Sequence, residues 1–318
     1  MDAVKTAGSG HTGTAMALAP LAHVLFTREL AYDAAAPGWP DRDRFVLSPG
    51  HASMLLYAVL HLVGYGVSLD DIRSFRRLGS ITPGHPETGT TPGVEVTTGP
   101  LGQGFSNAVG MALAERHLRA RLGAELVDHR TYAVVSDGDL MEGISHEAAS
   151  LAGHQQLGRL TAVYDDNHIT IDGSTDLALS DDVVARFGGY GWHVDDLGEA
   201  AEDTAALAAA FDRARLVDDR PSLVVVRTHI AYPMPNAVDT AAAHGAITDD
   251  AEIAAAKEAM GMDPTAVFAV SADVLDAYRA AGSRGAAARV EWEQRLADSG
   301  HDPAWLEALW SARAVEPA

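Results

Sequence analysis

The sequence predicts an α/β fold in which helices cover both faces of a parallel β-sheet, a three-layer α/β/α arrangement. Two apolar runs of strand length, residues 132–135 and 160–164, each end in a cluster of polar residues. One segment of helix length, residues 142–157, lies between them. Two strands joined by a helix form a parallel, right-handed crossover unit, so both polar clusters are expected at the carboxyl-terminal edge of the sheet.

The same alternation of apolar runs and amphipathic segments continues along the chain. It predicts two further strands, at residues 192–194 and 223–228. Further helices are expected at residues 15–28, 52–63, 69–76, 104–122, 180–188 and 204–217. Two segments rich in Pro, Gly and Thr, residues 82–98 and 231–246, are expected to form ordered loops at a functional site.

The chain is expected to divide into a main domain, residues 1–250, and a mostly helical extension, residues 251–318. In the extension, Trp292, Trp305 and Trp310 are available to pack on the main domain or on a partner. Residues 15–26 are apolar but include Pro20 and His23, which indicates a buried helix and not a targeting or membrane-spanning segment.

Composition excludes several classes of function. The 318 residues carry a formal net charge of -21, which repels nucleic acid and anionic membrane surfaces. The absence of cysteine excludes disulfides, thiolate catalysis and cysteine-bound metals, and it fits a reducing, cytoplasmic location. No Gly-x-Ser-x-Gly segment is present, and His146-Glu147 lacks the second histidine of a metallohydrolase, so neither class of hydrolase is favoured.

The polar clusters after the first two predicted strands contain hard oxygen donors. Asp137 follows one strand and Asn167 follows the other. An aspartate oxygen, an asparagine amide oxygen and nearby backbone carbonyls are ligands that Mg²⁺ accepts while it binds phosphate oxygens. Gly138 lets a diphosphate approach the backbone at the start of the next helix. The alternative is that Asp-Gly and Asp-Asn only terminate the strands.

Four histidines lie next to glycines in expected loops, at positions His11, His51, His85 and His244. A single loop histidine is usually only exposed, but imidazole also transfers protons near neutral pH and stabilises a developing alkoxide. Residues 99–104, Gly-Pro-Leu-Gly-Gln-Gly, indicate a helix start and lack the third glycine of a dinucleotide-binding loop.

Nine motifs resemble the amino-terminal half of the transketolases, in matching order from Ser9 to Gly245. They are Ser-Gly-His-Thr-Gly (9–13), Asp-Arg-Asp-Arg-Phe-Val-Leu-Ser-Pro-Gly-His (41–51), Thr-Pro-Gly-His-Pro-Glu (82–87), Thr-Thr-Gly-Pro-Leu-Gly-Gln-Gly (97–104), Ser-Asp-Gly-Asp (136–139), Met-Glu-Gly-Ile-Ser-His-Glu (141–147), Asp-Asp-Asn (165–167), Ile-Asp-Gly (171–173) and His-Gly (244–245). The resemblance implies the transketolase PP domain fold, which binds the diphosphate of thiamine diphosphate. The motifs predict that the similarity fades beyond about residue 262.

This resemblance implies thiamine diphosphate as the cofactor, bound through Mg²⁺ or through a substituting Ca²⁺ or Mn²⁺. It assigns the metal to Asp137, Asn167 and Ile169. The remaining cofactor contacts that it implies are His51, His244 and Gly138 at the diphosphate, and Gly99, Pro100 and Leu101 at the aminopyrimidine edge.

The resemblance also implies catalytic roles. His11, His85 and His244 would line the substrate channel and bind sugar hydroxyls. Glu142 by itself is a carboxylate at a helix start, stabilised by the helix dipole. In the family the matching glutamate lies at the subunit interface, in a proton path that links two active sites.

A full transketolase continues into a pyrimidine-binding domain and a carboxyl-terminal domain, and no segment of this chain resembles either. The resemblance therefore implies the amino-terminal subunit of a split transketolase, in a heterotetramer with a second polypeptide that supplies the missing domains. That enzyme would transfer a two-carbon ketol unit from a ketose (phosphate) to an aldose acceptor. The missing pyrimidine-binding domain would contribute the glutamate that activates the cofactor.

Three departures from the family pattern surround the expected site: Thr12 replaces a proline, Ser136 replaces a glycine, and residues 241–243, Ala-Ala-Ala, replace His-Asp-Ser. They lie beside the positions expected to bind metal and diphosphate, so they bear on substrate identity more than on the cofactor. Two alternatives therefore stay open. One is a non-catalytic, cofactor-binding scaffold or regulatory subunit, and the other is a carboligase that uses a specialised donor in secondary metabolism.

Overall fold

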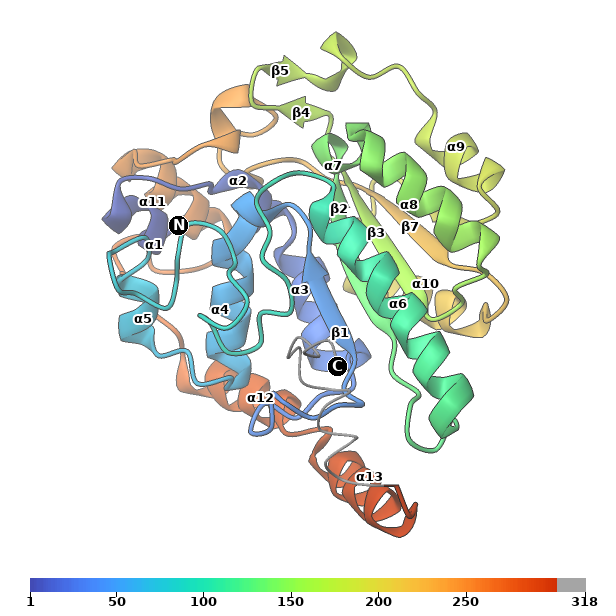
Figure 1. Cartoon of the computed structure of the whole chain (residues 1–318). Helices are drawn as coiled ribbons and strands as arrows, with labels where there is room; N and C mark the ends of the chain where they lie inside the picture. Colours follow the sequence, from blue (N-terminus) through green and yellow to red (C-terminus); the bar gives the residue numbers. More distant parts are fainter. Residues whose placement is uncertain (302–318) are drawn as a thin grey trace.

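A computed structural model of the chain describes residues 1–301 and contains a five-stranded sheet in the order β1-β2-β3-β7-β6 (Figure 1). The strands are β1 (Arg44–Leu47), β2 (Thr131–Ser136), β3 (Leu160–Asp166), β6 (His193–Asp196) and β7 (Ser222–Arg227). Every neighbouring pair in this sheet is parallel, so the predicted fold class is confirmed. The central strands β2 and β3 are buried almost throughout, as expected for strands covered on both faces.

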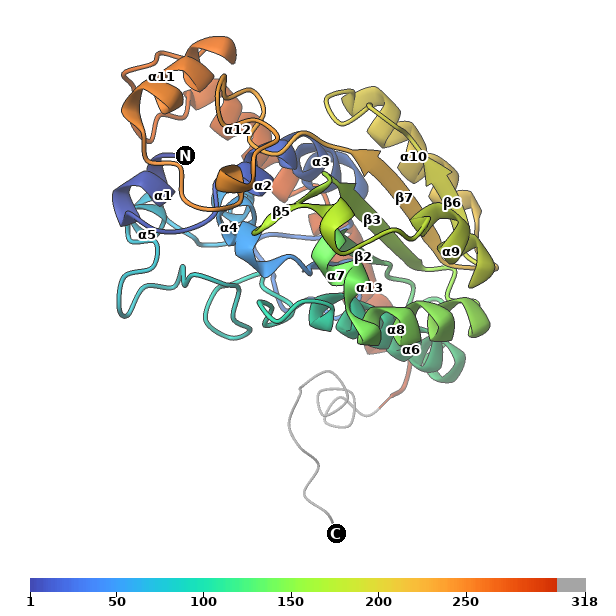
Figure 2. The ribbon, with the colours of Figure 1, turned by 90° about the horizontal axis from the view of Figure 1, so that it is seen from above.

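Side chains alternate between two apolar cores on either face of the sheet. Along β2, Tyr132 and Val134 belong to one core, whereas Ala133 and Val135 belong to the other. The first core packs under α3 (Ala19–Val24), α4 (Ser53–Val63) and α10 (Thr204–Leu216). The second packs under α6 (Gln103–Leu122), α8 (Gly143–His154) and α9 (Val183–Gly189), so the chain has three layers (Figure 2).

Shorter elements connect these layers. They are α1 (Asp2–Ala7), α2 (Gly13–Ala17), η1 (Leu25–Glu29), η2 (Gly50–Ala52), α5 (Leu69–Arg73), α7 (Asp137–Met141), β4 (Ile169–Thr170), β5 (Gly173–Ser174), η3 (Thr175–Leu177) and η4 (Ala241–His244). The predicted loops at residues 82–98 and 231–246 contain no strand, and η4 is the one helical turn within them. Among the described residues, no helix is long and apolar enough to cross a membrane.

One predicted helix is wrong in its continuity, and another is confirmed but follows a separate short helix. Residues 15–28 form three pieces, α2, α3 and the π-helical η1, because Pro20 lies at the start of α3 and has no N–H for the ladder. The predicted helix at residues 142–157 is preceded by α7, and Glu142 is extended between α7 and α8 (φ -68°, ψ 137°). The short strand β1 was not predicted, since only three of its residues are apolar and Asp-Arg-Asp precedes them.

The carboxyl-terminal part contains α11 (Asp250–Ala259), α12 (Ala272–Gly282) and α13 (Ala286–Asp298). Its described residues are therefore mostly helical, as the sequence predicts. Trp292 is buried against the main body, and its Nε1 donates to the Leu126 carbonyl at 2.9 Å. Trp305 and Trp310 lie outside the described residues. The division at residue 250 stays a prediction.

Candidate active site at the carboxyl edge of the sheet

The parallel register of β2 and β3 brings the two predicted oxygen donors to one edge. Ser136 pairs with Asp165, so Asp137 and Asn167 both follow directly where their strands end. Asp137 is 2% exposed, and its Oδ1 accepts a hydrogen bond of 2.5 Å from Tyr164. The Asn167 Oδ1 accepts from the Ile169 backbone N–H at 2.9 Å, which turns this oxygen and Ile169 toward each other.

The second oxygen of Asp137, Oδ2, is buried and has no hydrogen-bond partner among the described residues. Burial raises the pKa of Asp137 to about 6, and the negative charge of the nearby Asp166 adds to the rise. An unpaired buried carboxylate oxygen is costly unless a ligand or ion engages it. Asp137 also lines a cavity of about 360 Å³. The site therefore fits a divalent cation that would bind this oxygen.

No group of three His, Asp or Glu side chains within residues 1–301 is placed to hold a metal. The predicted ligand set contains a single carboxylate, with the Asn167 amide oxygen and the Ile169 backbone completing it. Such a set needs further oxygens from a ligand or water to fill the six positions that Mg²⁺ prefers. The assignment of Asp137, Asn167 and Ile169 as metal ligands stays a prediction.

Asp139 holds three segments of the edge together. Its Oδ1 accepts from Ser48 Oγ at 2.7 Å and from the Gly102 N–H at 2.8 Å, and its Oδ2 accepts from the Ser136 N–H at 3.0 Å. These bonds join the end of β1, the loop of residues 99–104 and the end of β2. Sequence reasoning missed this residue, although Ser136-x-x-Asp139 has the spacing of a capping box and could have revealed it.

The loop of residues 99–104 lies tightly against the start of α7 and the end of β1. A Cβ added to Gly138 would lie 2.9 Å from the Leu101 Cδ1, so these two residues are in contact. A Cβ added to Gly50 would lie 2.7 Å from the Gly99 backbone nitrogen. Gly99 itself has a φ of +144°, a conformation that side chains disfavour. The glycines at this edge therefore leave backbone groups accessible where a larger residue would cover them.

Glu142 lies beside the same loop. A Cβ added to Gly102 would come within 2.9 Å of the Glu142 Cβ. The Glu142 backbone caps α8 without a side-chain hydrogen bond, so its carboxylate is left for another partner. Pro100 precedes Leu101 in this loop. The interface role of Glu142 stays a prediction.

The four predicted histidines come from four separate segments and meet in one cluster. The His51 and His244 rings lie 4.5 Å apart between centroids, and His11 lies 5.3 Å from each of them. The His85 ring is 6.0 Å from His11. His85 also lies against Gly99, so the cluster adjoins the loop that contacts Gly138.

Burial keeps these imidazoles uncharged. Desolvation, together with a smaller contribution from the neighbouring His244, lowers the pKa of His11 to about 4. The same cause places the pKa values of His51, His85 and His244 below their ordinary value. Neutral imidazole has one donor and one acceptor nitrogen, so the cluster can exchange hydrogen bonds and protons with hydroxyl groups near neutral pH. The His11 Nδ1 is buried and has no partner among the described residues.

Arg76 is a second residue that sequence reasoning missed. Its charge contributes to lowering the pKa of His11 and of His85, after desolvation. The Arg76 backbone has a φ of 60°, and its Nε is buried without a hydrogen-bond partner within the described part of the chain. No local pattern distinguishes this arginine from the others in the sequence, so only the folded arrangement reveals it.

Comparison with known proteins gives a consistent family. Residues 1–315 match the family described as "Transketolase, thiamine diphosphate binding domain". The similarity therefore extends well past residue 262, where the motifs alone predict that it fades. The transketolase of Cereibacter sphaeroides is 54% identical over 298 residues, which are 93% of this chain and 45% of that protein. Transketolase-1 of Arabidopsis thaliana is 48% identical over 301 residues, or 93% of this chain and 40% of that protein.

Solved structures agree. The transketolase of Pichia stipitis in complex with sedoheptulose 7-phosphate superposes with a TM-score of 0.92 at 44% identity, covering 96% of this chain and 46% of that one. The transketolase of Campylobacter jejuni also gives 0.92, at 39% identity, with 96% and 48% coverage. The chain thus spans less than half the length of these relatives. With its sheet, its edge and nearly its whole length matched, this chain belongs to the family of transketolase thiamine diphosphate-binding domains.

Proposed function

We propose that this chain supplies the cofactor-binding half of a transketolase active site, and that a second polypeptide supplies the other half. The observation that supports this proposal most directly is the Asp137 Oδ2, which is buried and has no hydrogen-bond partner among the described residues. It lies at the same carboxyl edge of the sheet as the four neutral histidines. A cation-seeking oxygen and proton-exchanging imidazoles in one place suit a metal-anchored diphosphate next to a sugar. The complete reaction would transfer a two-carbon ketol unit from a ketose phosphate to an aldose acceptor.

The residues at this edge fit thiamine diphosphate held through Mg²⁺. Asp137, Asn167 and the Ile169 backbone would bind the metal. The diphosphate would lie against Gly138, His51 and His244, and the aminopyrimidine edge would face Gly99, Pro100 and Leu101. When bound, the thiazolium ring supplies the electron sink for the carbon–carbon cleavage.

The histidines would act on the substrate. Because their pKa values lie below the ordinary value, His11, His85 and His244 are neutral at pH 7 and can each donate one hydrogen bond and accept another. This suits them to orient sugar hydroxyls and to take up or return a hydroxyl proton as the bond breaks. The positive charge of Arg76 opposes protonation of His11 and His85 and so preserves this neutral state.

The second polypeptide would carry the pyrimidine-binding and carboxyl-terminal domains. Support comes from the coverage of the relatives, of which this chain matches 40–45%. Glu142 is exposed beside Gly102 and makes no side-chain capping hydrogen bond, so its carboxylate would be free to meet a group from another subunit. We propose a heterotetramer with two copies of each chain, as two such sites would face each other across the interface.

The test separates binding from turnover. Calorimetric titration of the chain with thiamine diphosphate should show saturable binding that requires Mg²⁺, Ca²⁺ or Mn²⁺. Ketol transfer from xylulose 5-phosphate to ribose 5-phosphate should then appear only after mixing with a polypeptide that carries the other two transketolase domains. Metal-independent or absent cofactor binding would overturn the site assignment. Turnover by this chain alone would overturn the two-chain proposal and leave the site assignment intact.

A further inference from the structure

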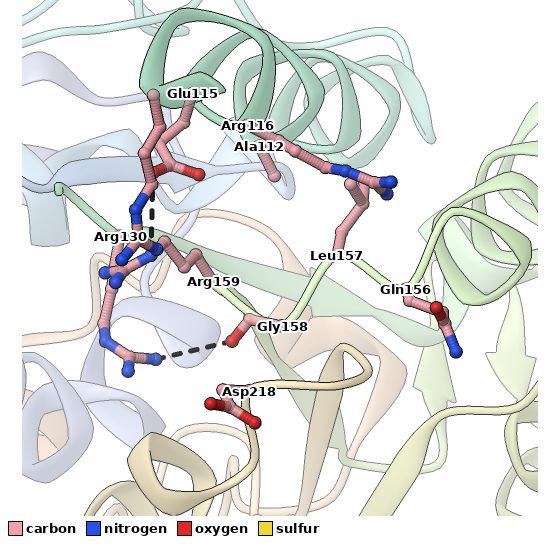
Figure 3. A pocket seen from close by; sticks show the side chains of 10 residues that line it. Ala112, Glu115, Arg116, Arg130, Gln156, Leu157, Gly158, Arg159 and Asp218 are labelled. Carbon is pink, nitrogen blue, oxygen red and sulfur yellow. Dashed lines mark hydrogen bonds and ion pairs between the residues drawn. The ribbon is translucent and has the colours of Figure 1, made fainter. Parts of the chain in front are cut away.

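A cavity of about 260 Å³ lies at the opposite, amino-terminal edge of the sheet (Figure 3). It is formed by the second half of α6, the residues just before β2 and β3, and the segment after α10. Arg130 lines it and immediately precedes β2, whereas Asp137 immediately follows β2. At about 3.3 Å per residue, the strand separates the two positions by roughly 23 Å. This cavity is therefore distinct from the candidate active site.

The lining is cationic in a strongly acidic protein. Four arginines line it, against one glutamate and one aspartate: Arg116, Arg119, Arg130, Arg159, Glu115 and Asp218. The whole chain carries a formal charge of -21. Concentrating four of the 23 basic residues around one cavity of this size needs a reason, since like charges at close range repel.

Two of the four guanidinium groups share one carboxylate at the rim. Asp128 binds Arg159 at 2.5 Å and Arg119 at 3.3 Å. The other two have no ion pair within the described residues. Arg130 donates to the Gly158 carbonyl at 3.5 Å and to the Arg215 carbonyl at 3.1 Å, and Arg116 donates to the Gln155 carbonyl. Each guanidinium carries five N–H groups, so Arg116 and Arg130 keep donors beyond those that bind these carbonyl groups.

Glu115 supplies an unpartnered polar atom in the cavity wall. It is 3% exposed, and its Oε1 lies 3.5 Å from the Arg159 Nε without receiving a hydrogen bond in the described structure. Burial raises the pKa of Glu115 to about 7 against the opposing charges of Arg159 and Arg119, with Asp128 and Asp41 adding to the rise. In its protonated form Glu115 would donate a hydrogen bond into the cavity, next to the guanidinium groups.

From this arrangement we infer that the cavity is a second ligand site, which binds a small phosphorylated anion, either inorganic phosphate or a phosphate monoester. Guanidinium groups bind phosphate oxygens through paired N–H donors at fixed geometry. Two arginines without carboxylate partners match the two charges of a phosphate dianion better than the single charge of a monocarboxylate. The inference does not depend on the function of the opposite edge, since none of its residues belongs to the candidate active site.

The experiment is calorimetric titration of the full chain with inorganic phosphate and with glycerol 3-phosphate, at constant ionic strength. Sodium chloride and glycerol serve as ligand controls. We expect saturable binding of both phosphates with Kd of about 1 mM or below. Tighter binding of glycerol 3-phosphate would identify a monoester as the ligand, and equal binding would identify the phosphate group alone.

Four variants locate the site. Arg116→Gln, on the exposed side of α6, and Arg130→Gln should each weaken binding about tenfold, because each removes charge-assisted hydrogen bonds. Glu115→Gln should strengthen binding at pH 8, where the wild-type carboxylate is largely ionised, and change it little at pH 6. Arg213→Gln makes the same charge change on α10 at a residue paired with Asp195 outside the cavity, and should leave binding unchanged.

Contrary outcomes are clear. Absence of saturable phosphate binding at 25 °C, up to about 10 mM ligand, would overturn the inference. So would binding that survives both Arg116→Gln and Arg130→Gln, or binding that is lost in Asp137→Asn, since that result would place the phosphate at the opposite edge. The Arg116→Gln variant, at an exposed position, keeps the test valid if Arg130→Gln does not fold.

Discussion

The two edges of the parallel sheet hold polar groups of opposite character. At the carboxyl edge, burial holds four imidazoles neutral and raises the pKa of Asp137 to about 6. At the amino edge, Arg116, Arg130 and Arg159 retain a permanent charge around the cavity. Uncharged imidazoles can accept and donate protons at a substrate hydroxyl, whereas guanidinium groups stay charged and can only hold an anion. The difference separates an edge suited to chemistry from an edge suited to binding alone.

The largest effect is expected at Asp137. Asp137→Asn keeps the shape but removes the charge that a divalent cation needs, so metal-dependent binding of thiamine diphosphate should weaken by about a hundredfold or more. Stability at pH 8 should not fall, since the change also removes an uncompensated buried carboxylate. Calorimetry and urea unfolding measure the two quantities. Asp172→Asn, at an exposed position in the turn between β4 and β5, is the matched control. Unchanged affinity for thiamine diphosphate in Asp137→Asn would contradict the proposed difference between the two edges.

The backbone at the carboxyl edge is packed so closely that adding one methyl group there should destabilise the fold. Gly50→Ala places a Cβ 2.7 Å from the Gly99 nitrogen and 2.8 Å from the Thr98 carbonyl carbon, both backbone atoms that have little room to shift. The free energy of unfolding should fall by about 1–3 kcal/mol. The Cβ of Gly110→Ala on α6 meets no atom of the described residues within 4 Å, so this variant should instead gain up to about 1 kcal/mol from helix propensity. Urea unfolding of both variants checks the opposite signs, and equal effects would contradict the argument.

Two capping boxes, one buried at Asp139 and one exposed at Asp71, show how much burial adds to the stability that this motif contributes. Asp139→Asn disturbs hydrogen bonds from Ser48, Gly102 and Ser136 and should cost about 2 kcal/mol of unfolding free energy. Asp71 forms the same capping box with Ser68 at the exposed start of α5, so Asp71→Asn should cost only about 0.5 kcal/mol. Denaturation curves of the two variants give the difference directly. A cost at Asp71 that equals the cost at Asp139 would show that burial of the edge adds nothing.

The smallest effect concerns pH. The pKa of His11 falls from 6.5 to about 4 on folding, so its contribution to stability is present above pH 6.5 and is lost as the pH falls toward 4. When the pH falls from 7.5 to 5, the free energy of unfolding of His11→Asn should fall by about 1 kcal/mol less than that of the wild type, after allowance for solvent screening.

His229 is a control for this pH dependence, because its pKa is shifted in the opposite direction to that of His11. The carboxylates of Asp239 and Glu199 raise its pKa, so its contribution is present below 6.5 and is lost as the pH rises through the raised value. His229→Asn should therefore lower stability at pH 5 more than at pH 8. If both histidine variants changed stability in the same direction with pH, the claim that the carboxyl edge holds neutral imidazoles would fail.

The sequence predicted the features that depend on chain direction and local pattern. Asp137 and Asn167 were placed at one edge because strand, helix and strand in succession leave few topologies. Helix α6 was predicted from its amphipathic length, and strands β2, β3 and β7 from runs that are mainly apolar. Strand β1 was missed because four residues beside charged neighbours carry too weak a signal.

Other features exist only in the folded chain. The glycine-flanked histidines could be singled out by type, but their meeting within 4.5–6.0 Å required four loops to converge. The lowered pKa values follow from burial at that meeting point, and so does the influence of Arg76. The cationic cavity joins residues of α6 with residues that precede β2 and β3, which no spacing in the sequence indicates.

By itself, then, the sequence determined the parallel sheet, its direction and the kinds of groups at its carboxyl edge, because hydrophobic period and crossover hand are local properties of the chain. Tertiary structure decided which of those groups touch, which are stripped of water and which titrate. Desolvation and Coulomb interactions depend on distances between segments far apart in sequence, such as His11 and His244, and those distances are defined only once the layers have packed.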